Sequence, residues 1–104
     1  MAQRSIVWTH TAARQRREIL KYWVGQNKST RFAERLIRLV AKRIKTISKH
    51  PESYKSTEYP GTRVSALGHF SIFYKLTKDH LIITAFWDNR QDPKKLLEII
   101  RKSD

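Results

Sequence analysis

The sequence of 104 residues contains no cysteine, which excludes a disulfide framework, thiolate chemistry and a cysteine-based zinc site. Its four histidines are scattered without the spacing of metal ligands, so we expect neither a metal site nor a cofactor. Long hydrophobic stretches are also missing: no run of about eighteen apolar residues occurs, and the start lacks the apolar region of a signal peptide. We therefore expect a cytoplasmic protein without membrane contact.

Glycine, proline and acidic residues are scarce as well, with three, three and nine of each. A chain of this length with 39% apolar residues fits one compact domain over residues 1–104. Because 22 Lys and Arg oppose the acidic residues, the formal net charge is +13. Such an excess indicates a polyanionic partner, either nucleic acid or an acidic protein segment.

Residues 70–88 predict a β-hairpin, because apolar and other side chains alternate on both sides of a two-residue turn at Lys78 and Asp79. With this turn, Leu76 pairs with Leu81 and every second residue faces one core. The predicted core face contains Phe70, Ile72, Tyr74, Leu76, Leu81, Ile83, Ala85 and Trp87. The opposite, open face contains Ser71, Phe73, Lys75, Thr84, Phe86, Asp88 and, beyond the strand, Arg90. We expect a functional site on the open face.

The rest of the chain predicts a short first strand and helices. Residues 5–9 read as a strand, and Thr9 is placed to cap a helix that Gly25 and Asn27 end. A second helix runs from a cap at Ser29 to His50 and Pro51, with a stripe of Phe32, Ala33, Leu36, Ile37, Val40, Ile44 and Ile47. A surface connection, a strand over 63–67 and a last helix capped by Asp92 and begun by Pro93 complete the pattern.

The predicted fold class is therefore α+β. An N-terminal strand is followed by an antiparallel helical hairpin, which packs on one face of a small sheet. A three-stranded antiparallel meander completes the sheet, and a short C-terminal helix follows.

This order, together with the segments Gly68 to Lys75, Trp87 to Pro93 and Trp8 to Ala13, resembles the RelE/ParE superfamily of bacterial type II toxin–antitoxin modules. The resemblance implies a growth-inhibiting, plasmid-stabilising toxin that a cognate acidic antitoxin neutralises. RelE-like members are ribosome-dependent endoribonucleases that cut mRNA, whereas ParE-like members act on DNA gyrase without that catalytic set.

Departures from the ribonuclease pattern favour the ParE-like, noncatalytic mode. Ser71 stands where many relatives carry an arginine, and no C-terminal Tyr or His matches their acid–base residue. Arg90, after the last strand, is retained, and of the basic pair at Arg63 and Ser65 at best one member is kept. Two alternatives stay open: a RelE-like mRNA endoribonuclease, and a non-toxic basic module that binds RNA or DNA.

If the chain is an enzyme, the open face offers Arg63, Lys75 and Arg90 for positive charge, and His69 and Asp88 carry protons. The alternative is a structural role for Arg90, in which Asp88 pairs with it at the strand end. The candidates for binding the nucleic acid or cellular target are Arg63, Lys75, Arg90, Lys94 and Lys95.

The antitoxin-binding candidates are two aromatic residues of the hairpin and three cations of the second helix, namely Phe73, Phe86, Arg35, Arg38 and Lys42. Alternative roles remain for both groups. The aromatic rings can stack bases or pack against the last helix, and the cations can form a solvated helix face.

Overall fold

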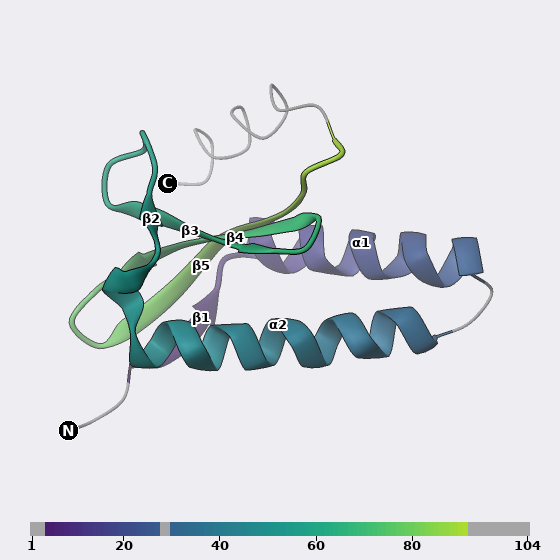
Figure 1. Ribbon diagram of the computed structural model, residues 1–104, viewed down its shortest axis with the longest axis horizontal. Helices are drawn as coiled ribbons and strands as arrows, with labels where there is room; N and C mark the ends of the chain where they lie inside the picture. The colour runs from purple at the N-terminus through teal and green to yellow at the C-terminus, as the bar shows by residue number, and fades with distance from the viewer. Residues whose placement is uncertain (1–3, 28–29, 92–104) are drawn as a thin grey trace.

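The computed structural model describes residues 4–27 and 30–91. Its elements, in chain order, are β1 (Ser5–Trp8), α1 (His10–Asn27), α2 (Arg31–Lys49), the 3₁₀ helix η1 (Pro51–Ser53), β2 (Lys55–Ser56), β3 (Thr62–Leu67), β4 (Phe70–Leu76) and β5 (His80–Asp88) (Figure 1). The predicted α+β class is confirmed: the first strand, the helical hairpin and the meander of β3, β4 and β5 all form. The predicted last helix, with Asp92, Pro93, Lys94 and Lys95, lies outside the described residues.

The strands form a five-stranded sheet in the order β1-β5-β4-β3-β2. β1 pairs with β5 in parallel, and the other neighbours are antiparallel. Helices α1 and α2 lie side by side along the same side of this sheet (Figure 1). No helix among the described residues is long and apolar enough to cross a bilayer.

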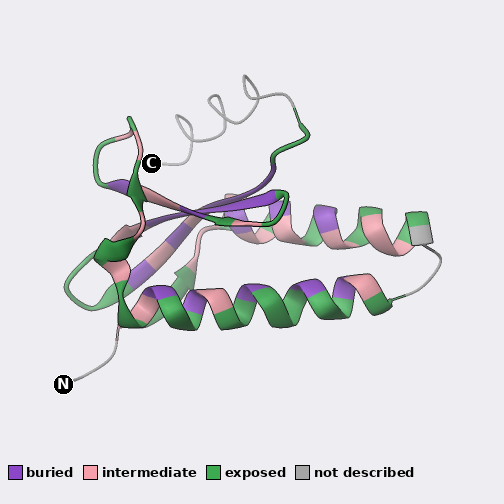
Figure 2. Cartoon of the chain, viewed as in Figure 1, coloured by how far each residue is buried: buried purple, intermediate pink, exposed green. Residues whose placement is uncertain are grey.

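The helices begin and end largely where the sequence indicates. The Thr9 hydroxyl accepts a hydrogen bond from the Ala12 N–H at 3.1 Å, so the predicted cap of α1 is confirmed. The predicted cap of α2 at Ser29 lies outside the described residues. The stripe of α2 that faces the core consists of Ala33, Leu36, Val40, Ile44 and Ile47 (Figure 2). Ile37 was predicted in this stripe but is 50% exposed.

The hairpin follows the predicted register only at its turn end. Leu76 pairs with Leu81, and the Thr77 N–H donates to the His80 carbonyl at 2.9 Å across the turn. Between Tyr74 and Phe73 the register shifts, so that Phe73 pairs with Ala85 and Thr84 is the extra residue of a β-bulge. Because side chains alternate with a period of two, one extra residue exchanges the faces of β5 beyond this point.

The bulge corrects the predicted faces of the hairpin. Phe86 is fully buried on the helix side, where its ring stacks on that of Phe70 with centroids 5.5 Å apart. Ala85 and Trp87 instead form a second cluster with Phe73, on the other face of the sheet. Asp88, which pairs with the core residue Phe70, also lies on the helix side. The predictions of Phe86 and Asp88 on the open face and of Ala85 and Trp87 on the helix face were therefore wrong.

Candidate functional site

Asp88 and Arg90 form a compact pair at the end of β5. The Asp88 carboxylate accepts hydrogen bonds from the Arg90 Nε at 2.9 Å, from Nη2 at 2.7 Å and from the backbone N–H at 3.0 Å. The Arg90 side chain is 47% exposed, whereas that of Asp88 is only 11% exposed. This bidentate geometry fixes the guanidinium in one orientation.

The pair sets the protonation states of both groups. Hydrogen bonds from Arg90 are the main cause that holds the pKa of Asp88 below its ordinary value, although partial burial opposes them; a smaller effect in the same direction comes from His69. The Asp88 carboxylate in turn raises the pKa of Arg90 through the same hydrogen bonds. A carboxylate with a lowered pKa is a weak proton acceptor at neutral pH, so Asp88 is poorly suited to act as a general base.

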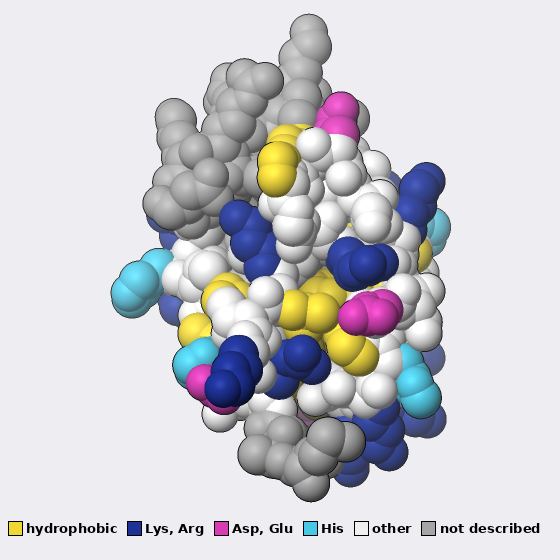
Figure 3. Space-filling view, turned by 90° about the vertical axis from the view of Figure 1, so that its left-hand side faces the viewer, with side chains coloured by type: hydrophobic (Ala, Val, Ile, Leu, Met, Phe, Trp, Pro, Cys, Tyr) yellow, Lys and Arg dark blue, Asp and Glu magenta, His cyan; other side chains and the backbone are white. Residues whose placement is uncertain are grey.

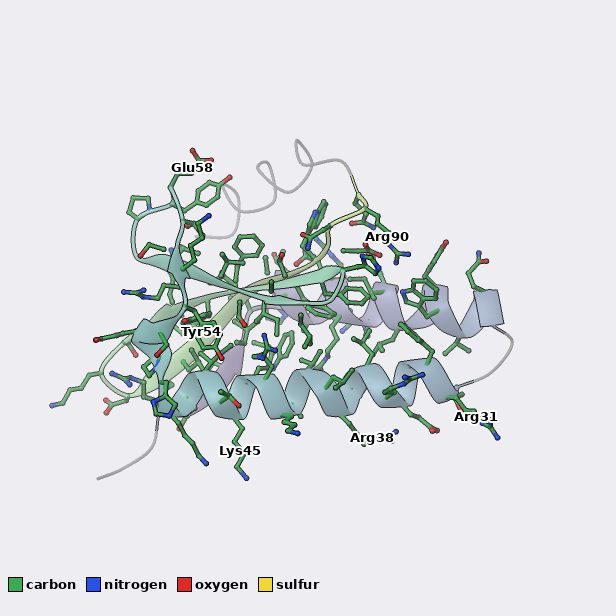
Figure 4. All side chains as sticks on the ribbon, viewed as in Figure 1. Arg31, Arg38, Lys45, Tyr54, Glu58 and Arg90 are labelled. Carbon is green, nitrogen blue, oxygen red and sulfur yellow. The ribbon has the colours of Figure 1, made fainter. Side chains whose placement is uncertain are left out.

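Arg90 faces α1 and not the open face of the sheet. Its guanidinium carbon lies 4.8 Å from the centre of the Trp23 ring, in cation–π geometry. Trp23 packs in turn against Phe32 of α2, with ring centroids 4.7 Å apart. Figure 4 shows Arg90 where the chain leaves the sheet, beside α1. Arg90 thus links the end of β5 to the helical hairpin. This contact supports a structural role for Arg90.

Ser71 holds the segment that follows β5. Its hydroxyl donates to the Asn89 Oδ1 at 2.9 Å, and the Asn89 N–H donates to the His69 carbonyl at 2.7 Å. Ser71 itself is 9% exposed and pairs with Trp87. The position that carries an arginine in many ribonuclease relatives therefore presents a buried hydroxyl that is already engaged.

Arg63 lies on the helix side of the sheet, which corrects its predicted place on the open face. It pairs with Tyr74, and its Nη1 donates to the Tyr54 carbonyl at 2.7 Å and, more weakly, to the Glu52 carbonyl at 3.4 Å. The neighbouring Tyr74 hydroxyl donates to the Pro51 carbonyl at 2.7 Å. Burial raises the pKa of Tyr74 to about 12. Arg63 and Tyr74 thus fasten the connection after α2.

Lys75 keeps its predicted place on the open face, where it follows Phe73 on β4 and pairs with Thr62 and Ile82. It is five positions from Phe70, or about 16 Å along the strand at ~3.3 Å per residue. The five catalytic candidates are consequently divided. His69, Asp88 and Arg90 meet at one end of the β4–β5 pair, whereas Arg63 and Lys75 lie at the other end on opposite faces.

The antitoxin-binding candidates divide in a similar way. Phe86 is fully buried and Phe73 is 7% exposed, so neither ring is available at the surface to stack a base or to contact another chain. Arg35, Arg38 and Lys42 are exposed on α2, on the side away from its buried stripe (Figures 2 and 4).

Sequence reasoning missed a cleft of about 680 Å³ between α1 and the end of β5. It is lined by Arg14, Gln15, Glu18, Ile19, Tyr22, Trp23, Phe86, Trp87, Asp88, Arg90 and Gln91. The buried Gln15 side chain accepts the Phe86 N–H through Oε1 at 2.9 Å. The signal for Gln15 was present in the sequence, because it stands between Ala12 and Ile19 at the three- and four-residue spacing of a core-facing stripe. Among residues 4–27 and 30–91, no group of three metal-binding side chains occurs.

The fold is that of a RelE/ParE-type toxin, and comparisons with known proteins identify the family. The family model described as ParE toxin of type II toxin-antitoxin system, parDE, matches residues 6–93, so the chain belongs to the ParE toxin family. A solved structure titled "Chromosomal ParDE TA system from P. aeruginosa" has the same fold, with a TM-score of 0.69 at 19% sequence identity. That match covers 81% of this chain and 94% of the other. Among curated proteins no relative was found.

Proposed function

We propose that this toxin inhibits growth by acting on DNA gyrase without cleaving RNA, and that a cognate acidic antitoxin neutralises it. The observation that carries the noncatalytic assignment is the closed pair of Asp88 and Arg90. The arginine that the ribonuclease reading would use on a phosphate is bound to a carboxylate and stacked on Trp23.

The chemistry of RNA cleavage supports this assignment. Attack by a 2′-hydroxyl needs a proton acceptor, a proton donor and positive charge at the nonbridging oxygens, and each contributes on the order of 10²-fold or more when well placed. Here Asp88 has a lowered pKa, Ser71 supplies no charge, and Arg63 is bonded to carbonyls at the opposite end of the β4–β5 pair. No two of the three cations proposed for catalysis share both one face and one end of the sheet.

The charge of the chain supports the antitoxin partner. A net charge of +13 and the exposed cations of α2 favour an acidic segment that associates rapidly by electrostatic attraction. Membership in a family of type II toxin–antitoxin systems gives the same partner class.

The test incubates the purified chain with DNA gyrase, ATP and relaxed plasmid. We expect loss of supercoiling and an increase in protein-linked, cleaved DNA. Because a chain with this charge also coats DNA nonspecifically, the matched control is plasmid relaxation by a type I topoisomerase at the same toxin and salt concentrations. Inhibition of gyrase alone supports the proposal, whereas equal inhibition of both enzymes, or of neither, contradicts it.

A further inference from the structure

The outward side of α2 carries an unbroken line of cations. Their positions follow one another at spacings of four and three residues, and at about 100° per residue they fall within an arc of about 80° around the helix. All of these side chains are exposed. We call this line the α2 ridge, and it consists of Arg31, Arg35, Arg38, Lys42, Lys45 and Lys49.

The α2 ridge lies opposite the side of the helix that packs in the core. The buried stripe of α2, with Val40 at its centre, is half a turn away. Figure 4 shows Arg38 and Lys45 on the side of α2 that points away from the sheet, and Figure 3 shows Lys and Arg side chains gathered at the lower right of the molecule seen from its end. Glu34, the one carboxylate of α2, lies outside the arc and accepts the Thr30 hydroxyl at 3.1 Å.

The ridge cations differ from the remaining cation of the same helix. Arg43 turns toward the sheet, where its Nη1 donates to the Ser65 hydroxyl at 3.0 Å and to the Ala66 carbonyl. Five ridge side chains, by contrast, have no hydrogen bond or ion pair with any of residues 4–27 and 30–91, namely those of Arg35, Arg38, Lys42, Lys45 and Lys49. The fold does not use these charges, and their mutual repulsion is relieved only when an anion binds.

The length and composition of the ridge match a nucleic-acid backbone. From Arg31 to Lys49 it measures about 27 Å at ~1.5 Å per residue, and over this length each strand of B-DNA presents about eight phosphates. No apolar or aromatic side chain lies within the arc, whereas protein interfaces depend on such anchors and are poor in lysine. The helix also lacks Asn and Gln, which read adenine in the major groove. The ridge is therefore suited to contact phosphates without selecting a sequence.

We propose that the α2 ridge binds the sugar–phosphate backbone of duplex DNA, so that this toxin engages gyrase where the enzyme holds DNA. The ridge runs along one backbone, and its cations replace the counterions of about five phosphates. The choice of DNA among the polyanions rests on the proposed action on gyrase. The inference adds the surface of the toxin that contacts this DNA.

Two other polyanions fit the ridge less well. An acidic polypeptide is attracted by the same cations, which speeds its encounter with the toxin, but the ridge offers no apolar anchor to hold it. Its line of charge is also less dense, because extended residues are ~3.3 Å apart and duplex DNA carries one charge per ~1.7 Å. Duplex RNA is recognised largely by its shape and its 2′-hydroxyls, and the arc of the ridge contains only cations.

The test measures the fluorescence anisotropy of a labelled 20-base-pair DNA duplex at several salt concentrations. We expect the logarithm of the binding constant to fall linearly with the logarithm of the salt concentration, with a slope of about −4 to −5, because each neutralised phosphate contributes about −0.9. Lys42→Gln with Lys45→Gln should make this slope shallower by about two units. At about 0.1 M salt the same variant should bind at least about tenfold more weakly.

A matched variant separates the ridge from the charge of the whole chain. Lys55→Gln with Lys78→Gln removes the same charge from exposed lysines of β2 and of the hairpin turn, and it should change the slope by less than about half a unit. Because all four lysines are exposed, both variants should keep the circular dichroism spectrum of the wild type. Equal changes of slope in the two variants would overturn the proposal.

Unlabelled competitors identify the polyanion that the ridge prefers. A 20-residue glutamate peptide, compared at equal concentration of charge, should displace the labelled duplex at least about tenfold less effectively than unlabelled DNA. An RNA duplex of the same sequence should displace it no more effectively than DNA does. Displacement by the peptide that equals displacement by DNA, or stronger displacement by RNA, would overturn the proposal.

The link to gyrase is measured in the supercoiling reaction. Lys42→Gln with Lys45→Gln should require about tenfold more toxin than the wild type for the same inhibition, and Lys55→Gln with Lys78→Gln no more than about twofold more. Inhibition that both variants retain in full would contradict the role of the ridge on gyrase-bound DNA. If the wild type itself failed to inhibit, the proposed function would be wrong, and the salt slopes would still decide whether the ridge binds DNA.

Discussion

Arg90 and the cations of α2 have the same charge but opposite surroundings. Arg90 is bound by two oxygens of Asp88 and stacked on Trp23, whereas Arg38 and Lys42 extend from an exposed helix face. The cation that occupies the position of a catalytic residue is the one that the structure neutralises. The comparison shows that the partner of an arginine, and not its position in a motif, decides what it can do.

The largest predicted effect concerns the bulge that turns Asp88 and Arg90 toward α1. Phe86→Ala should lower the free energy of unfolding by about 3–5 kcal/mol, because Phe86 is fully buried against Phe70 on the helix side. Urea denaturation followed by circular dichroism measures the change. Ile82→Ala, at a half-buried position before the bulge, is the control and should cost less than half as much. Equal losses would contradict the exchanged faces.

The next largest effect comes from removing the carboxylate that neutralises Arg90. Asp88→Ala removes an acceptor of three hydrogen bonds from Arg90, and we expect the free energy of unfolding to fall by about 1–3 kcal/mol. The same denaturation experiment on Asp79→Ala, an exposed carboxylate of the hairpin turn, should show a change below about 0.5 kcal/mol. A loss at Asp88 no greater than that at Asp79 would show that the pair contributes little.

The pH dependence of stability also tests the contribution of the Asp88–Arg90 pair. Because the pKa of Asp88 is lower in the folded state than its ordinary value of 3.8, its stabilisation is fully present above that value. It should be lost as the pH falls through the lower, folded-state pKa. The difference in stability between the wild type and Asp88→Asn should therefore be constant near neutral pH and shrink in acid. A difference that grew as the pH fell would have the wrong sign.

The smallest effect concerns the exposed cations. Arg38→Gln combined with Lys42→Gln should change the free energy of unfolding by less than about 0.5 kcal/mol, with any change toward higher stability because self-repulsion decreases. Thermal unfolding at low and high salt measures this, and the small gain should disappear at high salt. A clear loss of stability would mean that these cations have structural partners and are not a binding surface.

Much of the fold could be predicted because its signals are local. The three- and four-residue spacing of α2, the cap at Thr9 and the alternation beside the Lys78–Asp79 turn each follow from neighbouring residues. The faces of β5 beyond the turn could not be predicted, because the bulge at Thr84 results from packing between distant elements. The placement of Phe86 and Trp87 failed for this reason.

In the site, too, the local contacts could be predicted from the sequence and the contacts between distant residues could not. The pairing of Asp88 with Arg90 is local and was foreseen as one of two readings, whereas the contact between Arg90 and Trp23 spans most of the chain. Arg63 was assigned to the open face although Leu67 shares its side of β3 and pairs with the core residue Phe70. That pattern was available in the sequence and places Arg63 on the helix side.

The central claim, that the Asp88–Arg90 pair is structural and the toxin does not cleave RNA, is tested most directly in a cell-free translation reaction. The purified chain is added, and mRNA 5′ ends on ribosomes are mapped with and without Arg90→Ala. We predict no new ends at any codon position with either protein. Codon-phased cuts that the wild-type chain produces and Arg90→Ala abolishes would contradict the account and assign Arg90 to catalysis.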